Sequence, residues 1–101
     1  MPWFVKIESG TVRKSEFDRH VPAHLAYVKD LIAKGHQAQT GYWEHEEGGL
    51  LIFQAKDLEE ARAIVAADPL VQNNCVTYEL HQWHRVLPKE NRPLTDRKSV
   101  V

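Results

Sequence analysis

The stretch LLIFQAKDLEEARAIVAADP, residues 50–69, predicts a strand that leads directly into a capped helix. Residues 50–55 are apolar on both alternating faces, which is typical of a strand buried on both sides and therefore central in its sheet. The helix begins at a capping box, because Asp57 and Glu60 have the spacing of a side-chain acceptor followed three residues later by a glutamate.

The same helix has an apolar stripe and a defined end. Pro69 disfavours helical geometry in the residue before it, so the helix ends near Asp68. Helical spacing predicts four residues that face the core: Leu58, Ala61, Ile64 and Val65.

The flanking sequence adds three strands and one more helix. Apolar and β-branched patterns predict strands at residues 3–8, 36–43 and 75–84, the last with Val76, Tyr78 and Leu80 on one face. Pro22 suits the start of a helix and Gly35 suits its end. Residues 11–20 form a connection or a short helical turn, and Gly48 and Gly49 belong to the hairpin turn before residue 50. The order β-α-β-β-α-β predicts an α+β, ferredoxin-like fold, with two helices on one face of a four-stranded antiparallel sheet.

The other sheet face then stays uncovered. Two helices cannot cover all the large aromatic residues together with the doubly apolar strand: Trp3, Phe4, Tyr42, Trp43 and Trp83. A large uncovered apolar face marks an interface. The sequence therefore predicts a homodimer whose sheets pack face to face. The domain spans residues 1–87, and residues 88–101 form an extended tail.

Composition excludes several classes of partner. The 13 basic and 14 acidic side chains nearly cancel, so no basic face is available for nucleic acid. No apolar run approaches the roughly 20 residues of a membrane span, and no signal peptide precedes the first strand. A single cysteine, Cys75, cannot form an internal disulfide and fits a reducing compartment. We expect a cytoplasmic protein in which Cys75 is a small buried hydrophobe.

The six histidines do not predict a metal site. His81 and His84 are three apart on a strand and point to opposite faces, while Pro22 separates His20 from the helix that carries His24. His45 lies in a predicted turn. There is no phosphate loop and no nucleophile elbow, so we expect a protein without metal or cofactor.

His24 and Asp68 are the residues most suited to chemistry. His24 falls on the apolar stripe of the first helix, which we expect to bury Leu25, Val28, Leu31 and Ile32. In this fold the two helices lie side by side, so His24 and Asp68 meet if the helices are antiparallel. A carboxylate bonded to one imidazole nitrogen makes the other a general base near neutral pH. The structural alternative is a satisfied half-buried histidine and an aspartate that only ends its helix.

Two segments, PAHLAYVKDLIAKGHQAQTG and LEEARAIVAADPLV, resemble the YCII-related (YciI-like) family. The similarity lies in the His-Leu pair at the start of the first helix, the glycine-terminated helix leading to a glycine late in the second strand, and the Asp-Pro pair after the second helix. It covers about residues 3–86. The resemblance implies a dimeric α+β barrel with an active site at His24 and Asp68. It also implies lyase-like chemistry on small ring compounds such as halogenated hydroxyquinones.

One position departs from that family pattern, since members often have an arginine where Val21 stands. Arg13, Lys14 and Arg19 lie nearby, and Arg19 is our candidate for holding a substrate. The aromatic candidates for lining a pocket are Tyr42, Trp43 and Trp83. Besides a homodimeric enzyme with a small-molecule substrate, two alternatives stay open: a non-catalytic ligand-binding module and, on fold analogy alone, a cofactor-free oxygenase.

Overall fold

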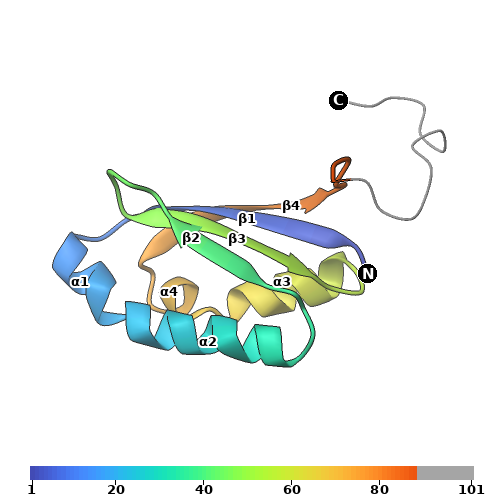
Figure 1. The fold of residues 1–101 in the computed structure, drawn as a ribbon. Helices are drawn as coiled ribbons and strands as arrows, with labels where there is room; N and C mark the ends of the chain where they lie inside the picture. Colours follow the sequence, from blue (N-terminus) through green and yellow to red (C-terminus); the bar gives the residue numbers. More distant parts are fainter. Residues whose placement is uncertain (89–101) are drawn as a thin grey trace.

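Four antiparallel strands form one sheet in the order β2-β3-β1-β4 (Figure 1). They are β1 (Trp3–Gly10), β2 (Gln39–Tyr42), β3 (Gly48–Gln54) and β4 (Val76–Trp83). The computed structural model describes residues 1–88, so the predicted tail lies outside the described residues from position 89 onwards. The apolar strand β3 and its neighbour β1 are the two central strands, as the pattern of residues 50–55 predicts.

All helices lie on one face of this sheet (Figure 1). They are α1 (Lys14–Arg19), α2 (Val21–Ala33), α3 (Leu58–Ala66) and α4 (Pro69–Gln72). The ferredoxin-like prediction is confirmed, with two short helices added to the two expected ones. One of them, α1, occupies the segment for which a connection or a helical turn was predicted. The other, α4, begins directly after Asp68, whose side chain accepts a hydrogen bond from the backbone N–H of Leu70 and caps it.

The core lies between the sheet and the helices. Its sheet side is aromatic and aliphatic, because Phe4, Leu51 and Phe53 are fully buried and the rings of Phe4 and Phe53 stack at 5.9 Å. The helices contribute Val28, Leu31, Ala61 and Val65. Asp57 caps α3 by accepting from the backbone N–H of Glu60, so the capping box is present in the structure.

The predicted inward faces of two helices need correction. On α2 the buried residues are His24, Val28 and Leu31, whereas Leu25 is 46% exposed and Ile32 is 53% exposed. Each of these two follows a buried residue directly, and one residue turns a helix by about 100°. Leu58, the first residue of α3, is also exposed.

Gly48 and Gly49 lie in β3 and not in the hairpin turn, which corrects the predicted position of both. Gly48 has a φ of +117°, and a Cβ there would lie 2.3 Å from the carbonyl oxygen of Glu8. A Cβ on Gly49 would lie 1.9 Å from the carbonyl oxygen of Gly41. Glycine at both positions therefore allows β3 to approach β1 and β2 closely.

The opposite face of the sheet carries apolar side chains without a covering helix. Alternation along the strands places Val5, Ile7, Leu50, Ile52 and Trp83 there, around a shallow hollow of about 370 Å³. Of the large aromatic residues that two helices were not expected to cover together, Phe4 is in the core on the helix side. Within residues 1–88 there is no helix with the length and hydropathy needed to cross a membrane.

Candidate active site

His24 and Asp68 are in direct contact. His24 Nδ1 lies 2.9 Å from Asp68 Oδ1, and both side chains are buried. His24 stands in the first turn of α2, and Asp68 occupies the junction between α3 and α4. The backbone N–H of Leu70 donates to the same Oδ1 at 3.0 Å, which fixes the carboxylate. The two residues singled out from the sequence are therefore brought together by the fold, while their chemical role stays a prediction.

A buried lysine completes this contact from the sheet. Lys6 Nζ lies 2.5 Å from Asp68 Oδ2 and 2.8 Å from Glu8 Oε2, and Lys6 and Asp68 are fully buried. Sequence reasoning missed both Lys6 and Glu8. A signal was present, because strand alternation places them on the same face as Phe4, which the helices cover. A lysine and a glutamate on a covered face indicate a buried ion pair.

The charges around Asp68 determine its protonation. Burial alone raises the pKa of this carboxyl group, but the hydrogen bond from His24 and the Lys6 ammonium outweigh burial and hold the pKa below its usual value. Asp68 is therefore ionised at neutral pH. Nearby, burial and the carboxylates of Asp68 and Glu8 raise the pKa of Tyr27, whose hydroxyl donates to the carbonyl oxygen of Ile64 at 2.5 Å.

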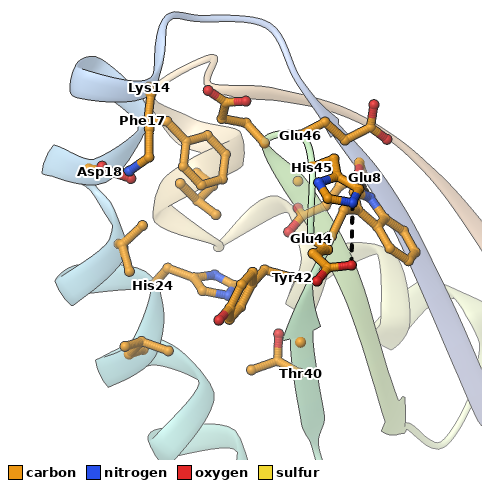
Figure 2. A pocket seen from close by; sticks show the side chains of 17 residues that line it. Glu8, Lys14, Phe17, Asp18, His24, Thr40, Tyr42, Glu44, His45 and Glu46 are labelled. Atoms are coloured by element: carbon orange, nitrogen blue, oxygen red, sulfur yellow. Dashed lines mark hydrogen bonds and ion pairs between the residues drawn. The ribbon is translucent and has the colours of Figure 1, made fainter.

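A cavity of about 790 Å³ opens beside His24 (Figure 2). It lies at the end of the molecule where α1 and the start of α2 face the hairpin between β2 and β3. His24 and Glu8 both line it, whereas Asp68 does not. Its apolar wall is formed by Phe17, Val21, Leu25 and Leu70. A pocket of this size, with an apolar wall and charged groups around it, has the dimensions of a small-molecule site.

Two of the predicted pocket residues line this cavity and two do not. Tyr42 lines it from β2 with 87% of its surface exposed, and Trp43 lines it while its indole N–H donates to the carbonyl oxygen of Glu8 at 2.9 Å. The expectation for Trp83 is corrected, because its position on β4 places it on the opposite sheet face. Arg19 is also absent from the cavity wall, since its guanidinium pairs with Glu16 on the exposed side of α1.

The two ring nitrogens of His24 have different surroundings. Since an ionised carboxylate only accepts hydrogen bonds, Nδ1 must donate to Asp68, and the neutral ring then carries its lone pair on Nε2. Among residues 1–88, Nε2 of His24 has no hydrogen-bond partner, while the ring lines the cavity. Nε2 is thus the nitrogen of the His24 ring that no described side chain or backbone group occupies.

Two further predictions concern Cys75 and metal binding. Cys75 is fully buried, as predicted, and burial raises the pKa of its thiol, so it is an unreactive core residue. Over the described part of the chain, no three His, Cys, Asp or Glu side chains are grouped to hold a metal ion. The expectation of a protein without metal or cofactor stays a prediction.

Three comparisons with known proteins agree on the family and the fold. The model of the YCII-related domain family matches residues 3–84. The uncharacterized protein YjpA of Bacillus subtilis (strain 168) is 31% identical over 74 residues, which cover 72% of this chain and 87% of YjpA.

A solved structure has the same fold at lower identity. It is the 5-chloro-2-hydroxyhydroquinone dehydrochlorinase TftG from Burkholderia phenoliruptrix AC1100, in complex with 2,5-dihydroxybenzoquinone. The match has a TM-score of 0.59 and 22% identity, and it covers 81% of this chain and 93% of TftG. The resemblance noted in the two sequence segments is thereby confirmed, and the chain belongs to the YCII-related family.

Proposed function

We propose that this protein is a small homodimeric enzyme that performs general acid–base chemistry on a cyclic or aromatic small molecule. His24 is the acid–base group and Asp68 orients it. The observation that carries the proposal is that the His24 ring lines the cavity while Asp68, buried behind it, holds Nδ1 at 2.9 Å. A base held in one tautomer next to an apolar cavity suits proton abstraction from a bound ring compound.

The step that this arrangement supports is an elimination. Nε2 of His24 takes a proton from a saturated ring carbon, which an aromatic substrate has in its keto tautomer. The electron pair of the broken C–H bond forms a double bond to the adjacent carbon, and the leaving group departs from that carbon with its own bonding pair. The imidazolium that forms is stabilised by the ionised Asp68 carboxylate. Proton transfer of this kind contributes about 10²–10⁴-fold in rate. The dehydrochlorinase activity named for TftG belongs to this class of reaction.

The homodimer part of the proposal is supported by the uncovered sheet face. Val5, Ile7, Leu50, Ile52 and Trp83 form an apolar surface on this face. Two such faces packed together would bury them, as the sequence pattern predicts. The expected interface is at least of the standard class of about 1,600 Å². The cytoplasmic location predicted from the sequence stays a prediction.

Chloride release and hydrogen exchange test the chemistry. Chlorinated hydroquinones are incubated with the full-length protein, free chloride is measured, and ring deuteration is followed by NMR in D2O. We expect His24→Gln to abolish both signals. His45→Gln is the matched control, because His45 lines the same cavity from the exposed hairpin and pairs with the exposed Glu44.

The assay also separates the enzyme from the non-catalytic alternative. A ligand-binding module would bind ring compounds and shift cavity resonances, yet neither release chloride nor exchange ring protons. Loss of activity in His45→Gln but not in His24→Gln would contradict the assignment of the base.

A further inference from the structure

The buried charges next to the cavity do not balance when His24 is neutral. One ammonium, that of Lys6, serves the carboxylates of both Asp68 and Glu8. Lys6, Asp68 and Glu8 are nearly or completely inaccessible to solvent. Such a cluster carries a net negative charge, and it becomes neutral only when a proton or another cation joins it.

Glu8 is the member of this cluster that faces the cavity. Its side chain is only 4% exposed, yet it belongs to the cavity lining. Oε2 lies 2.8 Å from Lys6 Nζ but accepts no hydrogen bond of good geometry from any residue within 1–88. The ion pair with Lys6 is short, yet the carboxylate is incompletely satisfied in its hydrogen bonding. A buried carboxylate in this condition gains free energy from an additional hydrogen-bond donor.

The backbone of Glu8 is held in position, while its carboxylate has only the shared Lys6 ammonium beside it. The Trp43 indole donates to the Glu8 carbonyl oxygen at 2.9 Å, and Gly48 packs against the same atom. Glu8 also lies between Gly49 of β3 and Tyr78 of β4 in the sheet. The side chain is therefore presented to the cavity by a rigid element.

The rim of the cavity is rich in acidic side chains, so its charge has the same negative sign as the buried cluster. Five acidic side chains line it, which are Glu8, Asp18, Glu44, Glu46 and Glu47. Among the described residues, Lys14 is the one lysine that lines the cavity, and no arginine lines it. The Lys14 ammonium is paired with the Asp18 carboxylate at 2.5 Å. Figure 2 shows Glu44, His45 and Glu46 on the hairpin side, facing Lys14 and Asp18 of α1. A cleft lined by one sign of charge concentrates ligands of the opposite sign.

We propose that the cavity selects ring compounds that carry a cationic N–H donor and excludes anionic ones, with Glu8 as the acceptor that recognises the donor. The inference rests on the proposed function for the choice of ring compounds as ligands. It concerns binding alone, so its test needs no turnover. A neutral ring compound with an O–H donor is expected to bind with intermediate affinity.

Three phenols that differ at one group test this selection. Tyramine, 4-(2-hydroxyethyl)phenol and 4-hydroxyphenylacetate share a phenol ring and a two-carbon chain, which ends as an ammonium, a hydroxyl and a carboxylate respectively. Dissociation constants are measured on the full chain from NMR shifts of cavity residues, at low and at high salt. We expect tyramine to bind at least about tenfold more tightly than 4-hydroxyphenylacetate at low salt, and this ratio to fall as salt rises.

Variants identify the residues that cause the preference for tyramine over 4-hydroxyphenylacetate. Glu8→Gln should lower the ratio by roughly tenfold, because a charge-assisted hydrogen bond is lost. Glu8→Asp, which keeps the charge, should retain most of the preference and serves where Glu8→Gln does not fold. The triple variant Glu44→Gln, Glu46→Gln, Glu47→Gln changes only the rim and should reduce the ratio about threefold. Glu79→Gln is the matched control, since Glu79 lies outside the cavity and pairs with His81.

The proposal is overturned if 4-hydroxyphenylacetate binds as tightly as tyramine, if none of the three phenols binds at millimolar concentration, or if Glu8→Gln leaves the ratio unchanged. These outcomes are independent of the chloride and deuterium assays. A protein that prefers tyramine but turns nothing over would retain this inference and lose the proposed enzymatic function.

Discussion

Lys6 Nζ lies 2.5 Å from Asp68 Oδ2, and this ion pair joins the central strand β1 to the residue that holds His24. The candidate active site is therefore built on a charge pair in the core, and its geometry depends on the sheet as much as on the helices. Substitutions of Lys6, which does not line the cavity, are therefore expected to alter the geometry of the site.

Lys6→Met is expected to destabilise the protein at neutral pH by about 3–5 kcal/mol, because Asp68 and Glu8 are left buried without their cation. Urea unfolding measures this free energy. Lys34→Met is the control, since Lys34 pairs with Asp30 on the surface and should change stability by no more than about 1 kcal/mol. Equal losses in both variants would contradict the importance of the buried pair.

Asp68→Asn is expected to lower the free energy of unfolding by about 3 kcal/mol at pH 7. This is the lower end of the range for a broken buried ion pair, because Lys6 still pairs with Glu8 in the variant. The pKa of Asp68 is lower in the folded protein than its unfolded value near 3.9. Its stabilisation is therefore complete above that value and is lost as the pH falls through the folded pKa. The gap between wild type and Asp68→Asn should close below about pH 4. A stability difference that stays constant down to pH 2 would show that the pKa of Asp68 is not lowered in the folded protein.

The neutral His24 ring should carry its proton on Nδ1. Nitrogen-15 NMR shifts of the imidazole distinguish the two tautomers. The chain provides a positive control in His36, whose Nδ1 lies 2.7 Å from the carbonyl oxygen of Gln54 and must donate to it. His45 is the exposed reference. A proton found on Nε2 of His24 would remove the base from the cavity and with it the proposed mechanism.

A series of glycine substitutions should separate backbone strain from steric contact. Gly41→Ala should be nearly neutral, since neither a positive φ nor a neighbour within 4 Å opposes it. Gly35→Ala should cost about 1–2 kcal/mol, because its φ of +89° strains an L-residue. Gly48→Ala should cost more than either, because strain and the contact with the Glu8 carbonyl act together. Thermal unfolding gives the order, and a different order would contradict the strand position of Gly48.

A charge on the open sheet face should separate the proposed dimer. Ile7→Asp places a carboxylate in the apolar surface, and sedimentation should then show a monomer where the wild type is a dimer. Ile32→Asp is the control, since Ile32 is exposed on α2, on the other side of the molecule. A wild-type chain that sediments as a monomer at micromolar concentration would end the dimer proposal.

The parts of the structure that follow from local rules could be predicted. The capping box at Asp57 and the doubly apolar strand at residues 50–55 depend on neighbours in sequence, and the structure contains both. The meeting of His24 and Asp68 followed from topology, because the fold sets the two helices side by side. The general-base role predicted for the pair stays a prediction.

The missed features depend on contacts between distant segments. Lys6 and Glu8 are charged residues in a strand whose pattern is set by its apolar residues, and their burial depends on the ion pairs that join Lys6 to Glu8 and to the distant Asp68. Trp83 was assigned to the pocket from residue type alone, while its register on β4 decides which face it occupies. Leu25 and Ile32 show that an apolar residue beside a stripe need not belong to it.

Because two carboxylates share one ammonium, few substitutions at these positions are compatible with the folded core. A substitution at any one of Lys6, Glu8 and Asp68 changes the charge that the other two experience in the core. Positions 6, 8 and 68 are thus expected to co-vary among relatives, although 62 residues separate the lysine from the aspartate. A homologue that replaces Lys6 with an apolar residue should also have lost the acid at position 8.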